Sequence, residues 1–360
     1  MKAIINGKII LKDRFVEDMA LLYSDVIEGV VPCDKVPADA QIIDACGGYV
    51  SPGLIDIHTH GCMGFDASDG ENLHKICEFM AKNGVTSFLP TTMTIDTKKL
   101  AEIFSADVEK SGAVILGYHA EGPYININKK GAQNGEFVKN PDLDEFKSFE
   151  NVKMVTVAPE LEGSEEFIKN CGCVVSIGHT DADYETVCKA AEWGAKCLTH
   201  TFNAMNGIHH REPGPIGAAL EKDMYIQVIC DRLHIHKSII KLLYKAFGSN
   251  KMIIISDSMR ACGLPDGIYD LGGQNVTVKN KTAYLDENTL AGSCSTLLDC
   301  VKKCVEFGIC EQDAFKMASQ TPAELLNINK GQLKVGFDAD FIALDENLNL
   351  KYTVINGEIQ

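Results

Sequence analysis

The chain has 360 residues, of which 45% are hydrophobic and 23% are charged, with a formal net charge of −16 at pH 7. This length suits one large α/β barrel with a modest accessory domain, and the ordinary composition argues against disorder. The acidic excess excludes the broad basic face that a nucleic acid or an anionic membrane requires, so any anionic ligand must be held by local groups.

The sequence predicts neither a transmembrane helix nor a secretory signal. It has no run of ~18 apolar residues, and its first residues lack the apolar core of a signal peptide. The 14 cysteines form no CxxC pair, and Cys171/Cys173 and Cys300/Cys304 lack a second pair at zinc-ribbon spacing. We therefore expect reduced thiols, a cytoplasmic location, and no membrane or nucleic-acid partner.

Short β-like runs, broken by Gly, Asp and Pro, occur at both ends of the chain. Near the start they are Lys2 to Ile5, Lys8 to Leu11, Ala20 to Leu22 and Gln41 to Asp44. Near the end they are Gly331 to Gly336, Ala339 to Leu344 and Tyr352 to Gly357. We expect residues 1–50 and 331–360 to pair into one small β-sandwich domain.

Between these ends, apolar runs of strand length alternate with longer amphipathic stretches, which is typical of βα units around a parallel sheet. The eight runs are Leu54 to His58, Thr86 to Pro90, Val114 to His119, Lys153 to Ala158, Val174 to Gly178, Ala195 to Thr199, Tyr225 to Cys230 and Met252 to Ser256. Residues 72–82, 181–193 and 237–246 are examples of predicted helices, and residues 271–285 predict a hairpin insertion. We predict a (β/α)8 barrel over residues 51–330, with its active site at the carboxyl ends of the strands.

Histidine and acidic residues stand at these strand ends. In the first run, His58 and His60 point to the same side, because side chains of a strand alternate between its faces. The third run is followed two residues later by Glu121, and the fifth, sixth and eighth runs are followed directly by His179, His200 and Asp257. A lone histidine in an apolar run is more often a hydrogen-bonded core residue than a ligand. Here all of these residues stand at the carboxyl ends of predicted strands, and this shared position favours a catalytic metal site over separate core residues.

Four imidazoles and a carboxylate suit zinc, iron or another borderline divalent metal. Glu121 is placed to bridge two ions, so we predict one or two divalent ions per subunit. Metal ions lower the pKa of bound water to ~7, and a free carboxylate nearby accepts its proton and returns it to a departing amine. We assign this role to Asp257. His119 stands two residues before Glu121, so its side chain points to the same face of the strand but lies deeper in the barrel. We therefore expect it to make structural hydrogen bonds.

With these residues in place, the chain resembles the N-acetylglucosamine-6-phosphate deacetylases of the amidohydrolase superfamily over nearly its whole length. The matching segments are PGLIDIH at 52–58, HAEGP at 119–123, KGAQ at 130–133, GHT at 178–180, THTFNAM at 199–205, REPG at 211–214, SDSM at 256–259, GLPDG at 263–267 and LAGS at 290–293. Phe-Asn-Ala-Met and Arg-Glu-Pro-Gly are particularly specific to these deacetylases, whereas the first segment marks only the superfamily.

The resemblance implies a reaction that converts N-acetylglucosamine 6-phosphate to glucosamine 6-phosphate and acetate in amino-sugar catabolism. It implies that Glu121, His179 and His200 hold the main metal. His58 and His60 would add a second site, which only some members of the family have.

The resemblance also implies that Asp257 is the catalytic acid and base. It implies that Asn203 and Ala204 help to bind the sugar phosphate, that Arg211 meets the phosphate and that His234 contacts the sugar. The implied pocket around the acetamide is completed by Ala132, Gln133, Leu290, Ala291 and Gly292. The family further implies a homodimer, with Arg211 meeting the phosphate across the interface. A guanidinium fork matches a phosphate dianion, which favours the phosphate role over the alternative for Arg211 taken alone, a surface ion pair.

Two positions depart from the family pattern, since Gln133 stands where many members have His and Arg232 where most have Gly. The Gln133 amide can donate a hydrogen bond to an oxyanion but cannot supply a proton. These departures leave the exact sugar preference open. The same chemistry on N-acetylgalactosamine 6-phosphate, a cyclic ureide or an N-acylated amino acid is the nearest alternative, because the fold alone does not exclude these amides. A barrel that has lost catalysis is an alternative of another class, and the complete ligand set with Asp257 argues against it.

Overall fold

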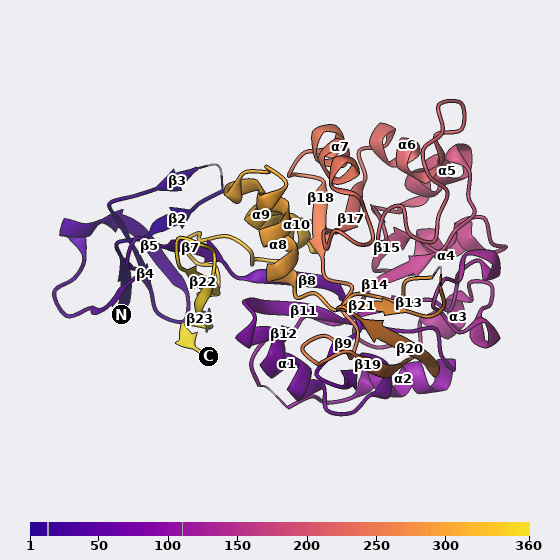
Figure 1. Ribbon diagram of the computed structural model, residues 1–360, viewed down its shortest axis with the longest axis horizontal. Coiled ribbons are helices and arrows are strands. Elements are labelled where there is room, and N and C mark those ends of the chain that lie inside the picture. Colours follow the sequence, from indigo (N-terminus) through magenta and orange to yellow (C-terminus); the bar gives the residue numbers. More distant parts are fainter. Residues whose placement is uncertain (13, 110, 288) are drawn as a thin grey trace.

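The computed structural model describes residues 1–12, 14–109, 111–287 and 289–360. Its larger part is a barrel of parallel strands surrounded by helices, and its smaller part consists of β-sheets (Figure 1). The barrel strands are β8 (Leu54–Thr59), β11 (Val85–Thr92), β13 (Tyr118–Glu121), β14 (Val152–Val157), β15 (Val174–Ile177), β16 (Cys197–Leu198), β17 (Tyr225–Ile229) and β18 (Met252–Ile255). Each overlaps one of the predicted runs, so the predicted (β/α)8 barrel is confirmed.

The barrel strands are apolar and buried on both faces, as is typical of parallel strands covered by helices. In β18, Met252, Ile253, Ile254 and Ile255 are all fully buried. β11 pairs with both β8 and β13, and the order then follows the chain to β18. A short strand, β12 (Val114–Ile115), also pairs with β11 before the chain enters β13.

β18 returns to the side of β8, and contacts at and just beyond the two strands close the barrel. The Asp257 N–H donates to the His58 carbonyl oxygen at 2.9 Å. The Ser256 hydroxyl donates to Asp56 Oδ2 at 2.5 Å in the buried seam below. The first and last strands therefore present their carboxyl ends side by side.

Helices follow the strands and cover the outside of the barrel (Figure 1). In α1, Leu73, Ile76, Cys77 and Met80 recur at helical spacing and are buried. The α-helices are α1 (Leu73–Lys82), α2 (Thr97–Ser105), α3 (Leu143–Phe146), α4 (Ser164–Asn170), α5 (Tyr184–Trp193), α6 (Gly214–Glu221), α7 (Lys237–Phe247), α8 (Leu297–Glu306), α9 (Glu311–Met317) and α10 (Gln320–Leu326). Short 3-10 helices are Cys33–Lys35, Ala67–Asp69, Ile127–Lys129 and Gly135–Phe137. Among the helices of the described residues, none has the length and apolar character needed to cross a membrane.

The two terminal segments build two sheets beside the barrel, and both chain ends lie there (Figure 1). One sheet has the order β5 (Ile27–Pro32), β4 (Met19–Tyr23), β1 (Lys2–Ile5) and β6 (Gln41–Asp44). The other has the order β24 (Glu358–Ile359), β23 (Leu350–Ile355), β22 (Phe341–Leu344), β7 (Tyr49–Pro52), β2 (Lys8–Ile10) and β3 (Phe15–Val16). Tyr23 and Phe341 pack together in a core shared by both sheets, with ring centroids 4.8 Å apart. The two sheets therefore form a sandwich, and β7 pairs with β22 across the two ends of the chain.

The structure differs from the sequence prediction at some terminal segments. Residues 331–336 form turns instead of a strand, because Gly331 and Gly336 have φ values of 73° and 82° and Val335 is exposed. The sequence did not predict β5 or β7. Gly29 interrupts the apolar run of β5, and β7 is short and ends at Pro52.

The expected hairpin at residues 271–285 is a three-stranded antiparallel sheet that begins earlier. Its strands are β19 (Gly267–Leu271), β20 (Gln274–Lys279) and β21 (Thr282–Tyr284). A two-stranded element of β9 (Gly61–Cys62) and β10 (Phe65–Asp66) follows β8. The buried Leu271, Val276 and Ala283 pack with Met93 and Met259 from the barrel loops, so the small sheet is joined to the mouth of the barrel.

The Lys330 side chain provides a stability test. Its Nζ lies 2.7 Å from Asp340 Oδ2, and only 12% of the Lys330 side chain and 3% of the Asp340 side chain are exposed. We predict that Lys330→Met lowers the free energy of unfolding by about 3–5 kcal/mol, because the Asp340 carboxylate is left buried without this partner. Chemical denaturation measures the difference.

The exposed Lys75–Glu78 pair supplies the control for this substitution. Its side chains are 46% and 37% exposed, so Lys75→Met should cost less than about 1 kcal/mol. Equal losses in the two variants would contradict the prediction.

Candidate active site

Buried side chains from different strands meet at the carboxyl end of the barrel. His58 lies in β8 and Glu121 ends β13, whereas His179, His200 and Asp257 follow β15, β16 and β18. The last three have φ values of 48°, 26° and 48°. Left-handed backbone costs a residue other than glycine of the order of 1–3 kcal/mol, and it concentrates at functional sites.

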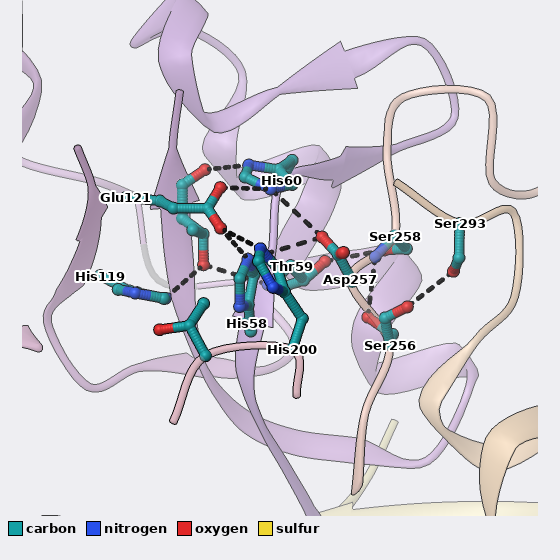
Figure 2. A network of polar contacts seen from close by, with 12 residues as sticks. His58, Thr59, His60, His119, Glu121, His200, Ser256, Asp257, Ser258 and Ser293 are labelled. Carbon is teal, nitrogen blue, oxygen red and sulfur yellow. Dashed lines mark hydrogen bonds and ion pairs between the residues drawn. The ribbon is translucent and has the colours of Figure 1, made fainter. Parts of the chain in front are cut away.

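The Glu121 carboxylate is the centre of this cluster (Figure 2). Its Oε1 lies 3.2 Å from His58 Nε2, 3.2 Å from His179 Nε2 and 3.0 Å from His200 Nε2. Its Oε2 lies 3.3 Å from His60 Nε2. Burial raises the pKa of Glu121, but the His58 charge and the hydrogen bonds with His179 and His200 outweigh it and hold that pKa well below its usual range.

The other ring nitrogen of three of these histidines faces a carbonyl oxygen. A carbonyl oxygen only accepts, so Nδ1 carries a hydrogen whether the ring is charged or neutral. When the ring loses its Nε2 proton, as a metal ligand must, the Nε2 lone pair points at Glu121. The pairs are His58 Nδ1 with Gln227 Oε1 at 2.9 Å, His60 Nδ1 with the Thr91 carbonyl at 3.1 Å, and His179 Nδ1 with the Lys129 carbonyl at 2.9 Å.

This arrangement fits a metal ion. The Nε2 atoms of His179 and His200 are only 3.0 Å apart, and the buried His58 Nε2 makes no hydrogen bond within the described residues. Lone pairs that converge on a carboxylate repel one another unless a cation lies among them. Two groups have ligand atoms close enough to share an ion, namely His58, His60 and Glu121, and Glu121, His179 and His200.

Asp257 faces the same cluster from the seam between β18 and β8 (Figure 2). Its Oδ1 lies 3.2 Å from His60 Nε2 and 3.5 Å from His58 Nε2. Burial raises the pKa of Asp257, but the neighbouring His58 and His60 lower it to about 2. The side chain is therefore an ionised carboxylate that can accept a proton.

A cavity of about 400 Å³ opens onto the cluster, which is a usual size for a small-molecule site. Most of the predicted substrate contacts line it, and these are Ala132, Gln133, Asn203, Ala204, His234, Leu290 and Gly292. Ala291 is instead buried in the core of the small β19–β21 sheet. Arg211 is exposed on the loop before α6, lies outside the cavity lining and contacts His210 at 2.6 Å. The structure therefore brings together all but these two predicted substrate contacts.

Gln133 is held in one orientation. The backbone N–H of Thr94 donates to its Oε1 at 2.7 Å, so the amide NH2 points the other way and donates to Glu121 Oε2 at 2.5 Å. The Gln133 amide thus supports the carboxylate, in addition to lining the cavity.

The sequence analysis missed several residues of the site. Further cavity-lining residues are Met93, Asn128, Lys129, Gly131, Leu271 and Thr289. Gln227, which holds the His58 ring, was detectable as a polar residue inside the apolar run of β17. The carbonyl groups that hold His60 and His179 belong to the backbone and leave no sequence signal.

Two larger cavities lie elsewhere. One of about 570 Å³ is lined by residues that include Gly112, Tyr118 and Gln360, and one of about 960 Å³ is lined by residues that include Glu160, Lys169 and Trp193. Neither metal-ligand group found among the described residues borders either of them. The cavity that opens onto the Glu121 cluster is therefore the candidate active site.

The sequence and the structure are similar to proteins of known activity. Residues 49–359 match the model of the Amidohydrolase family. N-acetylglucosamine-6-phosphate deacetylase of Bacillus subtilis (strain 168) is 38% identical over 347 residues, which cover 90% of this chain and 88% of that protein. The chain belongs to the N-acetylglucosamine-6-phosphate deacetylases of the amidohydrolase family.

Solved structures of the family have the same architecture. The deacetylase from Pasteurella multocida superposes with a TM-score of 0.92 at 28% identity, covering 100% of this chain and 99% of that one. A variant of the Mycobacterium smegmatis deacetylase, in complex with N-acetyl-D-glucosamine-6-phosphate, gives a TM-score of 0.92 at 27% identity, with coverages of 99% and 98%. The barrel and the terminal sheets therefore both belong to the family fold.

We predict that Zn²⁺ or Fe²⁺ stabilises the chelator-treated protein, because the ion separates the converging lone pairs. At a free ion concentration about 100 times Kd, a single site adds about 2.7 kcal/mol, measured as a rise in Tm by calorimetry. Glu121→Ala should abolish the rise. His119→Gln is the control, since His119 bonds Thr156 at 2.8 Å instead of facing Glu121, and it should keep the ion-dependent rise. An equal rise in Glu121→Ala would contradict the prediction.

Proposed function

We propose that this chain hydrolyses the acetamide of N-acetylglucosamine 6-phosphate. The reaction adds one water, breaks the bond between the carbonyl carbon and the nitrogen, and yields glucosamine 6-phosphate and acetate. The observation that carries the proposal is that Glu121, Asp257 and three imidazoles of the cluster line one cavity, while the fourth imidazole, His58, lies behind them against Glu121. The activity named for the relatives supports this choice of amide.

Asp257 acts as the base and then as the acid in this proposal. Its carboxylate takes a proton from the attacking water while the water oxygen bonds to the carbonyl carbon. It then gives this proton to the nitrogen, which leaves with the electron pair of the broken bond. A divalent ion bound by the Glu121 cluster would polarise the carbonyl and lower the pKa of water.

The ligand set supports zinc or iron, because imidazole nitrogen and carboxylate oxygen suit these borderline metals. One ion would be held by Glu121, His179 and His200. The second group, His58 and His60 with Glu121, supports a second ion in the same subunit.

Some features stay predictions from the sequence. These are the cytoplasmic location, the homodimer, and the division into a β domain of residues 1–50 and 331–360 and a barrel of residues 51–330. The sandwich of terminal sheets supports the division.

The first test is acetate release from N-acetylglucosamine 6-phosphate by metal-reconstituted and chelated protein. We predict metal-dependent release, with much slower release from N-acetylglucosamine because the phosphate anchor is missing. Equal rates from N-acetylgalactosamine 6-phosphate, or release only from a cyclic ureide or an N-acylated amino acid, would reject the proposed substrate.

Asp257→Asn tests the acid and base role. It keeps the size of the side chain but cannot accept the proton, so kcat should fall by about 10²–10⁴ while metal content stays at the wild-type level. Metal analysis and acetate release measure the two effects on the same sample. A variant with near-normal kcat would refute the assignment.

Mixed dimers test the role of Arg211. Arg211→Ala should raise KM for the phosphorylated substrate, because a phosphate loses its guanidinium partner. If Arg211 acts across the interface, mixing Arg211→Ala with Asp257→Asn restores activity, since an Arg211→Ala subunit with intact Asp257 receives Arg211 from its neighbour. No recovery in a verified mixed dimer would exclude action across the interface.

A further inference from the structure

The His234 ring lines the cavity and is held by a carboxylate that lies outside the cavity lining. His234 Nδ1 lies 2.7 Å from Asp231 Oδ2, and these side chains are only 6% and 1% exposed. Asp231 Oδ1 accepts the backbone N–H groups of Leu233 at 2.8 Å and of His234 at 3.0 Å. One carboxylate oxygen therefore shapes the loop after β17, and the other fixes the ring.

The charges around the pair favour a protonated ring. Burial lowers the pKa of His234, but the hydrogen bond and charge of Asp231, with a smaller effect of Asp257, raise it above its ordinary value. Burial raises the pKa of Asp231, but the hydrogen bond and charge of His234, together with the backbone N–H groups of His234 and Leu233, bring it below its ordinary value. An imidazolium with Nδ1 bonded to Asp231 presents its Nε2–H to the cavity as a charged donor.

Other groups near the pair do not replace this interaction. Cys294 and Cys300, which lie within reach of the Asp231 charge, are neutral thiols, because burial raises the pKa of Cys294 to about 11 and that of Cys300 well above its ordinary value. Arg232 is directed to the outside, with its guanidinium 3.4 Å from Glu306 and over the Phe307 ring.

The cavity needs a positive group of its own if its ligand is a phosphate ester. Arg211 of the same chain lies outside the cavity lining. Lys129 does line the cavity, but its Nζ already lies 3.3 Å from Asp181 Oδ1 and 2.8 Å from Asn206 Oδ1. His234, whose pKa is raised by Asp231, is thus a group in the cavity wall that can carry a positive charge, separate from the histidines around Glu121.

We propose that Asp231 is a positioning residue, which fixes His234 as a charged hydrogen-bond donor to a phosphate oxygen of the substrate. This inference rests on the proposed function, because it takes the ligand to be a phosphate ester. Asp231 acts through His234 and does not touch the substrate.

Asp231→Asn separates the charge of the ring from its orientation. The side-chain oxygen of the Asn can still accept hydrogen bonds from the two backbone N–H groups, and its NH2 group then donates to Nδ1 of His234. The ring becomes neutral with its hydrogen on Nε2, so a donor remains but the charge is lost. We expect KM for N-acetylglucosamine 6-phosphate to rise roughly tenfold, because charged hydrogen bonds are about twice as strong as neutral ones. We expect kcat to change less than KM, and KM for N-acetylglucosamine to change little.

The pH dependence provides a readout that a merely structural role would not give. In the wild type, affinity for the phosphate ester is full below the raised pKa of His234 and falls as pH rises through it. In Asp231→Asn this fall should occur at lower pH. Ionisation of the substrate phosphate affects the wild type and the variant equally, so a difference between their pH profiles on the same substrate comes from the protein.

Two further variants complete the experiment. Asp183→Asn is the matched control, because Asp183 also accepts a backbone N–H, at 2.8 Å from Thr186, but caps α5 outside the cavity lining. It should leave KM and the pH dependence unchanged. His234→Gln removes the charge while Asp231 stays, and it should reproduce the phosphate-specific rise in KM even if Asp231→Asn folds poorly.

The ring titration is measured independently of activity, by NMR of the histidine ring protons, with His234→Gln identifying the signal. An unchanged midpoint in Asp231→Asn, or equal KM changes for phosphorylated and unphosphorylated substrates, would overturn the proposal. Failure of the wild type to release acetate would count against the proposed function alone, because the titration still tests the effect of Asp231 on His234.

Discussion

A buried glutamate surrounded by four imidazole nitrogens is the constraint on which the rest of the structure depends. Glu121 is almost fully buried, with all four nitrogens within 3.3 Å of its oxygens. An isolated buried charge costs more than the about 5–15 kcal/mol that stabilises a typical folded protein, so this carboxylate needs positive charge around it. Because the imidazoles come from three strands, β8, β15 and β16, the site exists only when the barrel is closed.

Barrel closure also explains the local backbone. His179, His200 and Asp257 all adopt left-handed conformations directly after a strand. The strands below are paired in register, so the strain is confined to the residues that turn into the mouth. The small β19–β21 sheet and the loop of Gln133 then cover the mouth and leave a cavity of about 400 Å³.

The sequence predicts the barrel and the metal-ligand cluster because both follow from short-range patterns. Apolar runs mark the strands, and the polar residue at each run's end marks the mouth. Contacts that depend on tertiary structure lie beyond this reasoning, such as the carbonyl groups that hold His60 and His179. Ala291 was assigned through its motif, but burial in the small sheet separates it from the cavity lining. The turns at residues 331–336 follow from the left-handed Gly331 and Gly336, which an apolar run does not reveal.

The pairing of β7 with β22 has a consequence for folding during synthesis. Residues 53–340 lie between these two strands, so β7 leaves the ribosome with its early partner β2 long before β22 exists. At about 5–20 residues per second, the wait is on the order of tens of seconds. Throughout this time one edge of β7 has no partner strand, and unpaired edges are sites of aggregation. The sandwich can be completed only after the barrel strands have been synthesised, so the pairing of β7 with β22 is a late step in the folding of each new chain.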